Sequence, residues 1–560
     1  MKGLKHIIPI LLLLLIFIST HLSYPSFASY DGPLYDSSAY SECRGHPERA
    51  LYNGGILRNQ TPHFENVIDD HGRLSYSPVF LLNNLTRSTF YCFSIWVKLE
   101  VESSAVVIRA RLITENSTTT CVGNVIARHG CWSFLKGGFL SNLPSNSSRL
   151  YFQRNEGNET KIAIDGASLQ QFTQEQWAIN QDVNINKRRK RAVTLHVSDQ
   201  YGDSLRGASI KVEQISKDFL FGSAIADTII GNSPYQKWFT KRFNAAVFEN
   251  ELKWYATEPK PRQLNYTKAD KMLQFVQSNQ ISTRGHNIFW EDPKYTPSWV
   301  RNLTYPELKL AVKSRIQSLL QRYKDDFIHW DVNNEMLHFN FYEEKLGSNA
   351  SLEFFMVAHE IDPLATLFMN EFNVVETCND VNSSVDGYIL RMKELRKSGV
   401  WMDGVGLEGH FTVPNLPLMR ATIDKLATLD IPIWLTEVDI RNTLSMQAQA
   451  LYLEQVLREG FAHPAVNGIM LWSAMHVEGC YQMCLTDNEF RNLPTGDVVD
   501  KLLEEWQTGL VEGLTNERGS YSFYGFLGEY RITTRYGGRS INSTFSLSPS
   551  DETRHVNIQI

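Results

Sequence analysis

Two glutamates are the residues best placed to carry chemistry, because each directly follows an apolar run. They are Glu335, preceded by Asn334, and Glu437, preceded by Thr436. A pair of carboxyl groups is what hydrolysis of a glycosidic bond needs, since one must protonate the leaving oxygen and the other must attack or activate water. A lone glutamate after a strand is usually a surface carboxylate. Two of them in this setting favour a catalytic pair.

Further polar and aromatic side chains recur where apolar runs end. They are carboxylates, amides, imidazoles, an amine and indoles: Glu249, Asn250, Lys253, His286, Trp290, Asn370, Asn373, Glu408, His410, Asp439 and Trp472. Such groups converging on one surface indicate a sugar-binding site. Cysteines and histidines are too few around them for a metal cage. We therefore expect no metal and no cofactor.

The elements that must position these residues lie between 217 and 512, where apolar runs alternate with amphipathic segments. Eight strands are predicted, at 221–226, 245–249, 281–289, 327–333, 365–370, 404–407, 431–436 and 468–472. The clearest helices are predicted at 305–323, 388–397, 416–429 and 446–459. This alternation predicts an α/β fold, a (β/α)₈ TIM barrel, in which the carboxyl ends of all strands meet on one face. An open doubly wound sheet is the alternative, but no Gly-x-Gly-x-x-Gly follows the first strand.

The flanks of the barrel are predicted to be β. Residues 41–180 contain short aromatic and β-branched runs separated by polar turns, which predicts a β-sandwich. Residues 181–216 are expected to form a linker and a hairpin around Gly202. The C-terminal segment 513–560 contains a second hairpin around Gly537-Gly538. We expect the two hairpins, at 193–213 and 528–560, to pack together as a small flanking β domain.

Composition and charge exclude several functions. Hydrophobic residues make up 42% of the 560 residues and the net charge is −6, so the chain has sizeable cores and lacks the positive field of a nucleic-acid binder. No P-loop motif occurs. The basic run 187–191 is interpreted as a solvated linker, with a processing site or a polyanion contact as the alternatives.

The first 29 residues read as a signal peptide, with Lys2 and Lys5 before a short apolar run and small residues after it. Sequons for N-glycosylation support export, and they lie at Asn59, Asn84, Asn116, Asn146, Asn158, Asn265, Asn302, Asn349, Asn382 and Asn542. No second long apolar run follows. These features predict a secreted glycoprotein of the extracellular space or cell wall, without a membrane span after signal cleavage.

Export permits disulfides. Four cysteines in the N-terminal third allow three pairings, which the sequence leaves open: Cys43, Cys92, Cys121 and Cys131. Cys480 and Cys484 are close enough to clip a loop. Cys378 is then expected to be a buried free thiol.

The barrel segments resemble plant endo-1,4-β-xylanases of glycoside hydrolase family 10. The resemblance rests on Phe243–Trp254, Arg284-Gly285-His286 with Trp290, Trp330–Glu335 and Leu435–Asp439. Together these segments span the predicted barrel, which is over half of the chain. Less specifically, the N-terminal region resembles a family 22 carbohydrate-binding module, through runs such as Gly130–Phe134.

The resemblance implies a retaining endo-1,4-β-xylanase that acts on xylan or arabinoxylan. We also expect a monomer, and the net charge argues against a nucleic-acid partner. Glu335 matches the acid/base and Glu437 the nucleophile. Asn334 matches the residue that bonds the sugar 2-hydroxyl. The matches to residues that orient the nucleophile or line the sugar wall are His410, Asp439, Glu249, Asn250, Lys253, His286, Trp290 and Trp472.

The chain also departs from the microbial pattern of this family. Glu408 stands where glutamine is usual, adding a third carboxylate that should raise the pKa of Glu437 unless it is itself protonated or paired. The other departures are Glu291-Asp292-Pro293, Ser473 and Cys480-Tyr481. Three rival functions stay open: a transglycosylase on the same site, a wall-binding protein with little activity, and an enzyme acting on β-glucan or mannan.

Overall fold

The computed structural model describes residues 30–68, 74–101, 104–115, 119–141, 144–154, 161–400 and 402–560. The segment Tyr35–Ile560 forms one compact unit. The predicted signal peptide and the sequons at Asn116 and Asn158 lie outside the described residues.

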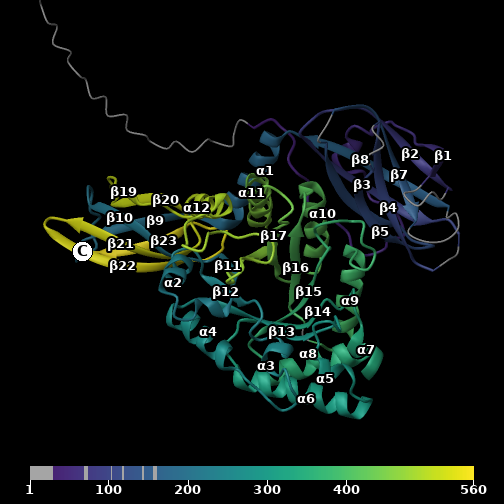
Figure 1. Cartoon of the computed structure of the whole chain (residues 1–560). Coiled ribbons are helices and arrows are strands. Elements are labelled where there is room, and N and C mark those ends of the chain that lie inside the picture. The colour runs from purple at the N-terminus through teal and green to yellow at the C-terminus, as the bar shows by residue number, and fades with distance from the viewer. Residues whose placement is uncertain are drawn as a thin grey trace, which may run out of the picture. The chain divides into compact units, whose positions relative to one another are not determined.

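Eight parallel strands close into a barrel in chain order, which confirms the predicted fold (Figure 1). Each strand is buried along nearly its whole length, as expected for a sheet covered on both sides. The strands are β11 (Leu220–Ile225), β12 (Ala245–Phe248), β13 (Ser282–Trp290), β14 (His329–Asn334), β15 (Thr366–Glu371), β16 (Gly404–Phe411), β17 (Ile433–Ile440) and β18 (Val466–Leu471). All eight predicted strands are present. β16 and β17 run about four residues further than predicted, so the polar residues expected after them lie within them.

Helices cover the outside of the barrel and begin at recognisable caps. The longest begins at Thr304, whose side chain and that of Glu307 form a capping box. The four predicted helices correspond to α6 (Tyr305–Arg322), α9 (Val385–Lys397), α10 (Leu416–Ala427) and α11 (Met446–Ala462). The other helical elements of this region are η3 (Asp227–Ile229), α2 (Ser233–Thr240), α3 (Trp254–Thr257), α4 (Thr267–Ser278), α5 (Ser298–Arg301), α7 (Phe341–Leu346), α8 (Ala350–Ile361) and α12 (Pro494–Glu505).

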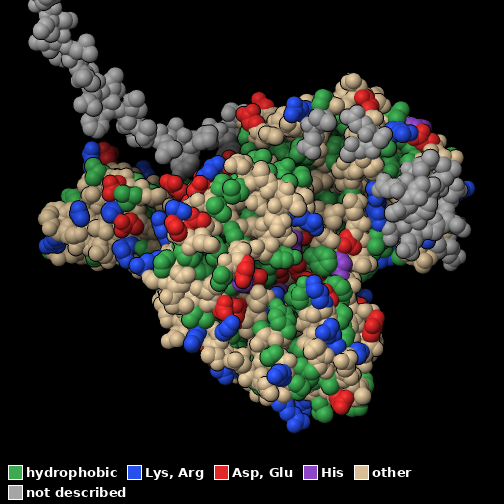
Figure 2. Space-filling view, in the orientation of Figure 1, with side chains coloured by type: hydrophobic (Ala, Val, Ile, Leu, Met, Phe, Trp, Pro, Cys, Tyr) green, Lys and Arg blue, Asp and Glu red, His purple; other side chains and the backbone are tan. Residues whose placement is uncertain are grey.

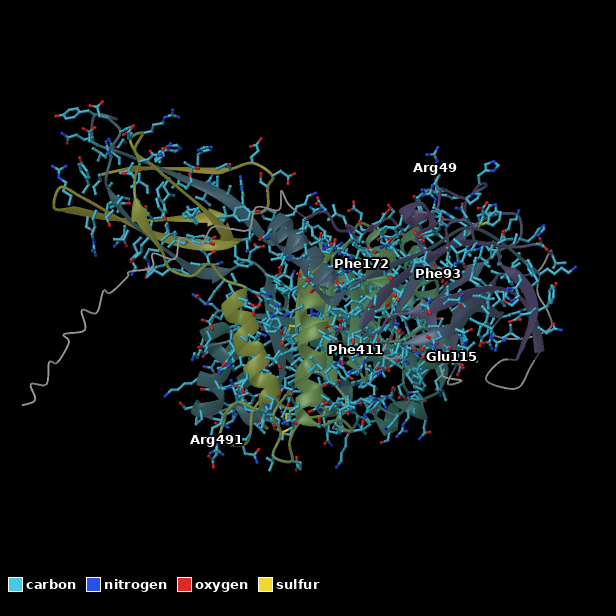
Figure 3. The ribbon with its side chains drawn as sticks, turned by 90° about the horizontal axis from the view of Figure 1, so that it is seen from above. Arg49, Phe93, Glu115, Phe172, Phe411 and Arg491 are labelled. Carbon is cyan, nitrogen blue, oxygen red and sulfur yellow. A yellow bond between two sulfur atoms is a disulfide. The ribbon has the colours of Figure 1, made fainter. Side chains whose placement is uncertain are left out.

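Two antiparallel sheets form the predicted N-terminal sandwich, with an apolar cluster between them that includes Phe80, Phe93 and Leu150. A short helix, η2 (Leu51–Gly54), precedes the strands. The five-stranded sheet has the order β1 (His63–Ile68), β2 (Leu74–Leu85), β7 (Ser145–Arg154), β4 (Val106–Thr114) and β5 (Thr119–Ala127). The three-stranded sheet has the order β6 (Ser133–Ser141), β3 (Thr89–Leu99) and β8 (Ile162–Phe172). Figure 3 places Phe93 and Phe172 on this part and Phe411 on the barrel.

The basic run at 187–191 is not a linker, contrary to our interpretation. It ends helix α1 (Gln174–Arg189) and begins β9 (Lys190–Ser198). Arg189 donates to the carbonyls of Phe461 and His463 and lies over the Phe219 ring. The cation satisfies carbonyl groups at the C-terminal end of α11 and in the loop that follows it, so the run is structural at this position.

A small β unit combines strands that precede the barrel in the chain with strands that follow it. One sheet has the order β19 (Val511–Leu514), β10 (Ser209–Lys217), β21 (Gly528–Tyr536) and β22 (Arg539–Leu547), and the other has the order β20 (Ser520–Phe526), β9 and β23 (Arg554–Gln559). The hairpin predicted around Gly537-Gly538 is present as β21 and β22. The hairpin predicted around Gly202 is wrong: β9 and β10 lie in different sheets and pair with C-terminal strands instead. A shared apolar cluster covers the inner faces of both sheets.

Three disulfides are present in the described residues, Cys43–Cys131, Cys121–Cys378 and Cys480–Cys484. The expectation for Cys378 is therefore wrong, and the buried free thiol is Cys92. The eight described sequon asparagines are all exposed. Among the described helices, none is long and apolar enough to cross a membrane.

Candidate active site

A cleft of about 470 Å³ opens at the carboxyl ends of the barrel strands. Acidic and histidine side chains gather where this face is hollowed (Figure 2). The predicted residues that line the cleft are Glu249, Asn250, Lys253, His286, Trp290, Asn334, Glu335, His410, Glu437 and Trp472. Asp439 is buried behind them. One closed barrel thus brings together side chains from the second to the eighth strand.

Glu437 stands beside Glu408 because β16 and β17 are paired at this level. Their register aligns Glu408 with Glu437 and His410 with Asp439, after an irregularity that follows Leu407. His410 Nε2 lies 3.6 Å from Glu437 Oε2 and 3.5 Å from Glu408 Oε2, while Nδ1 lies 3.0 Å from Asp439 Oδ1. Burial disfavours the charged imidazolium, but Asp439 and the contacts with both glutamates raise the pKa of His410 well above its usual value.

Asn370 at the end of β15 links several of these groups. Its Nδ2 lies 3.0 Å from the side-chain oxygens of Asn334, Glu408 and Glu437. Thr436 donates to its Oδ1 at 2.5 Å, which fixes the orientation of the amide. The Asn370 carbonyl also accepts the backbone N–H of Glu335 at 3.0 Å. Asn370 therefore bonds the side chain of Glu437 and the backbone of Glu335, the two candidate catalytic residues.

A series of buried polar contacts inside the barrel leads to Glu437. Arg284 Nη2 lies 2.7 Å from Asp331 Oδ1, and Asp331 Oδ2 lies 2.9 Å from His286 Nδ1. His286 Nδ1 is 3.9 Å from Glu437 Oε1. Burial opposes ionisation of Asp331, but Arg284 and His286 keep its pKa below the usual value. These contacts fix the imidazole of His286 beside the Glu437 carboxylate.

The two candidate carboxyl groups have pKa values displaced in opposite directions. Burial, together with the charges of Glu371 and Glu437, raises the pKa of Glu335 to about 8, although the Trp290 N–H opposes the rise. Burial would also raise the pKa of Glu437, but His286, His410 and Lys253 outweigh it and lower that pKa. At neutral pH this pair then consists of one protonated carboxyl group, on Glu335, and one carboxylate, on Glu437, the combination needed for acid–base and nucleophilic work.

The wall beside the pair combines aromatic rings with polar groups. Lys253 Nζ lies 4.6 Å from the Trp290 ring centre and 5.6 Å from that of Trp472. Trp290 stacks on Tyr295 with their ring centres 3.9 Å apart. Trp472 meets His286 edge to face. Flat apolar faces beside hydrogen-bonding groups suit a pyranose ring, which is apolar above and below and polar at its rim.

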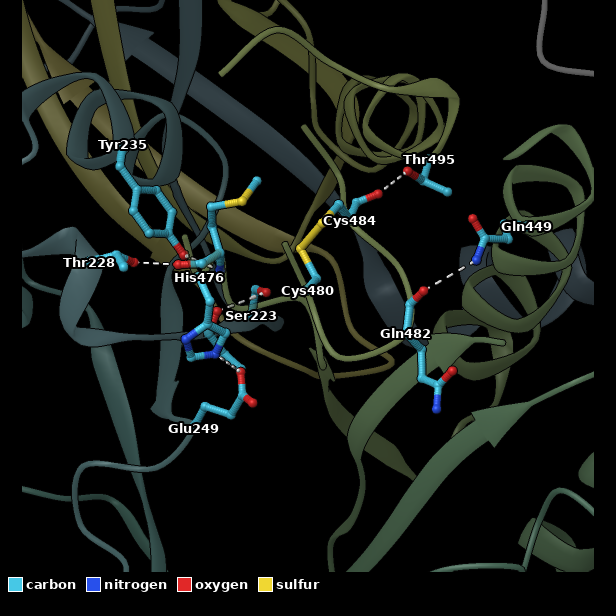
Figure 4. Close-up of a disulfide and its surroundings, with 12 residues drawn as sticks. Ser223, Thr228, Tyr235, Glu249, Gln449, His476, Cys480, Gln482, Cys484 and Thr495 are labelled. Atoms are coloured by element: carbon cyan, nitrogen blue, oxygen red, sulfur yellow. Dashed lines mark hydrogen bonds and ion pairs between the residues drawn. A yellow bond between two sulfur atoms is a disulfide. The ribbon is translucent and has the colours of Figure 1, made fainter. Parts of the chain in front are cut away.

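Polar contacts hold this wall in place. Glu249 Oε2 lies 3.0 Å from His476 Nε2, and the Tyr255 hydroxyl donates to Asn250 Oδ1 at 2.8 Å. Figure 4 shows the Glu249–His476 pair next to the loop clipped by Cys480–Cys484. That loop supplies Tyr481 and Gln482 to the cleft. The hydrogen-bonding side chains of the wall are therefore held by partners outside the cleft floor.

Comparison with known proteins identifies the family of this chain. The profile described as Glycosyl hydrolase family 10 matches residues 211–482. Endo-1,4-beta-xylanase 4 of Arabidopsis thaliana is 34% identical over 97% of this chain and 97% of its own. Endo-1,4-beta-xylanase 5 of the same plant is 36% identical over 89% and 87%. The chain belongs to glycosyl hydrolase family 10. Its enzyme class is therefore glycoside hydrolase, as the sequence predicts.

A crystal structure of xylanase 10B from Thermotoga petrophila in complex with xylobiose is 24% identical to this glycosyl hydrolase. It covers 51% of this chain and 94% of its own, with a TM-score of 0.46.

Several residues in or behind the cleft of this family 10 hydrolase were not assigned a role from sequence. Asn370, buried behind the cleft, ends a predicted strand, but nothing local shows that its amide reaches three other strands. The lining residues without an assigned role come from loops whose course the sequence does not give: Tyr255, Asp292, Tyr295, Phe339, Phe372, Asn373, Glu376, Arg441, Tyr481 and Gln482. Aromatic, amide and charged residues shortly after the second to fifth, seventh and eighth strands are the signal that could have found them.

Some residues singled out in the sequence lie elsewhere. Glu291 does not line the cleft: it is buried, accepts from Asn333 Nδ2 at 2.8 Å and from the Tyr342 N–H at 2.9 Å, and burial raises its pKa to about 7. Trp330 is a core residue. The departure at Glu291 therefore changes the support of β14 rather than the sugar wall itself.

One trio of side chains has the donor types of a metal site. Ligand atoms of Glu408, His410 and Glu437 lie within 4.8 Å of one another. The same three groups already contact each other, since His410 Nε2 faces both carboxyl groups. The arrangement is explained by these contacts within the cleft.

Proposed function

We propose that this protein is a retaining endo-1,4-β-xylanase that hydrolyses internal bonds of cell-wall xylan or arabinoxylan. The observation that carries the proposal is that Glu335 and Glu437 line one cleft, where His410 and His286 lie against Glu437. The opposite displacement of the pKa values of the two glutamates supports it. The names of the Arabidopsis relatives, which match nearly the whole chain, support xylan as substrate.

In the first step, ionised Glu437 attacks the anomeric carbon while protonated Glu335 gives its proton to the leaving glycosidic oxygen. The bond to the leaving sugar breaks and a covalent glycosyl-enzyme forms. In the second step, Glu335 takes a proton from water, which attacks the same carbon and releases Glu437. Retention requires the two carboxyl groups to be about 5–5.5 Å apart.

The supporting residues have separate roles in this mechanism. His410, held by Asp439, and His286, held by Asp331, orient Glu437 and favour its charged form. Asn334 would bond the sugar 2-hydroxyl at the cleavage subsite, with its own amide oxygen fixed by Asn370. Glu249, Asn250 and Lys253 would grip the neighbouring sugar, and Trp290 and Trp472 would supply apolar surfaces for the rings.

Product analysis tests the proposal. Wild-type chain acting on xylohexaose should release shorter xylo-oligosaccharides from internal positions, and NMR should show the β-anomer as the first product. Glu437→Ala should abolish this release, and azide should restore turnover of an aryl xyloside by Glu437→Ala as the α-azide. A first product in the α-configuration would overturn the retaining mechanism, and no release above Glu437→Ala would overturn the enzyme activity.

The same assays separate the rival functions. A labelled xylo-oligosaccharide acceptor that becomes incorporated into longer products identifies transglycosylation. Faster cleavage of cello- or manno-oligosaccharides than of xylo-oligosaccharides would identify another polysaccharide as the substrate. Binding to insoluble xylan without cleavage would identify a wall-binding protein.

We further propose that the chain is a secreted, monomeric glycoprotein whose N-terminal sandwich is carbohydrate-binding. The signal-like segment 1–29 and the eight exposed sequon asparagines support secretion. Expression in plant cells should yield chain in the medium whose mass falls on treatment with an endoglycosidase. Affinity electrophoresis in xylan, with Glu437→Ala in the full chain, measures carbohydrate binding in the absence of turnover.

A further inference from the structure

The loop 372–384, between β15 and α9, forms one wall of the cleft. It contributes Phe372, Asn373 and Glu376 to the lining. Glu376 also accepts the backbone N–H of His410 at 3.3 Å, so the loop contacts the strand that carries the orienting histidine. The position of this loop therefore decides the shape of the cleft beside His410.

The same loop is covalently bonded to the N-terminal sandwich. Cys378 forms a disulfide with Cys121 on β5, and Asn124 Nδ2, also on β5, donates to the Cys378 carbonyl at 3.2 Å. At the far end of the loop, the N–H of Ile126 donates to Asp386 Oδ2 at 2.8 Å. Cys121 and Cys378 are buried together with Leu418. Strand β5 of the sandwich thus holds Cys378 of the loop by two contacts and the first turn of α9, directly after the loop, by a third.

From Cys378 the contacts continue to the residues that follow Glu335. Asp380 Oδ2 lies 2.9 Å from His338 Nε2 and accepts the Asn373 amide at 2.8 Å. The His338 ring stacks on Phe372 with ring centres 3.7 Å apart. The backbone N–H of His338 donates to the Glu335 carbonyl at 3.3 Å. The wall of the cleft is therefore bonded to the sandwich on one side and to the Glu335 segment on the other.

We propose that the N-terminal sandwich is a structural part of the substrate cleft, and that Cys121 and Cys378 are positioning residues that hold the wall 372–384 in its substrate-binding place. The sandwich then acts on the cleft through this loop, in addition to any carbohydrate that it binds itself. An unanchored loop has many conformations, and ordering it on binding would weaken substrate affinity.

The test compares two variants of the full chain that each lack one disulfide. Cys121→Ser/Cys378→Ser removes the bond to the wall, and Cys43→Ser/Cys131→Ser removes a bond confined to the N-terminal part. We expect faster hydrogen exchange in 372–384 and an increase of about tenfold in KM for xylohexaose in the first variant only, with a smaller change in kcat. Equal exchange and equal KM in both variants would overturn the proposal.

A second variant covers the case in which Cys121→Ser/Cys378→Ser does not fold. Asn124→Ala keeps the disulfide and removes the bond to the Cys378 carbonyl, and it should speed exchange at 376–380 and raise KM by a smaller factor. No change in either readout would contradict the inference. The expected change in KM rests on the proposed function, whereas the expected change in hydrogen exchange does not. A chain that never cleaves xylohexaose would refute the function while exchange still reports the role of the tether.

Discussion

Nδ2 of Asn370 lies 3.0 Å from Oε1 of Glu437, although β15 and β17 are separated by β16. The amide reaches Glu437 because the ends of these strands converge at the mouth of the closed barrel. A hydrogen bond to a charged group contributes about 1.5–3 kcal/mol. This contact gives Asn370 a measurable role in activity.

Replacing Asn370 by alanine should lower kcat/KM on xylohexaose by about 10- to 100-fold, because a hydrogen bond to a charged group is lost. Steady-state kinetics measures this change. Asn557→Ala is the matched control, since Asn557 is exposed on β23. An Asn370→Ala enzyme within twofold of wild type would show that the amide does not support Glu437 in the transition state.

The pH dependence of kcat/KM should be bell-shaped. Activity requires Glu437 to be ionised, so it rises with pH through a midpoint below the ordinary glutamate value of 4.5. It also requires Glu335 to be protonated, so it falls as pH rises through about 8. Glu335→Gln, assayed with an aryl xyloside whose leaving group needs no proton, should lose the alkaline limb. Persistence of that limb would assign it to another group.

Glu408 should be uncharged at the pH of activity. Burial and the nearby Glu437 and Glu335 raise its pKa well above the usual value. Replacing a neutral carboxyl group by the neutral amide of Glu408→Gln should therefore leave the acid-limb midpoint of kcat/KM where it is in wild type. An ionised Glu408 would raise the pKa of Glu437, so a fall of about one unit in that midpoint on substitution would contradict the prediction.

The buried pair Lys136–Asp424 should be important for stability. Its atoms lie 2.7 Å apart, with side-chain exposures of 3% and 2%, and it joins β6 to α10. Lys136→Met removes the ammonium partner of a buried carboxylate that keeps the Tyr35 hydroxyl and the His463 ring as neighbours, and it should destabilise the fold by about 3 kcal/mol. Calorimetry should show a lower unfolding temperature.

The exposed pair Arg206–Glu517 provides the matched control for that experiment, with side-chain exposures of 73% and 81%. Arg206→Met should cost less than about 1 kcal/mol, because water screens the charges. Equal effects of the two substitutions would show that Lys136 is not held in the dry interface seen here.

The sequence by itself determined the barrel and the kinds of groups at its mouth. Strand and helix periodicities are local, so 221–226 or 416–429 can be recognised from a few residues. Glu335 and Glu437 are recognised because each follows such a run. The local pattern did not indicate where β16 and β17 end, because polar residues continue both strands, and the strands are longer than predicted.

The tertiary structure decided which distant residues meet. Cys378 pairs with Cys121 across 257 residues, and β9 pairs with β20 and β23 rather than with β10. Nothing local distinguishes these partners, because each choice depends on where the rest of the chain folds. The opposite pKa displacements of Glu335 and Glu437 have the same origin, since burial and neighbouring charges exist only once the barrel has closed.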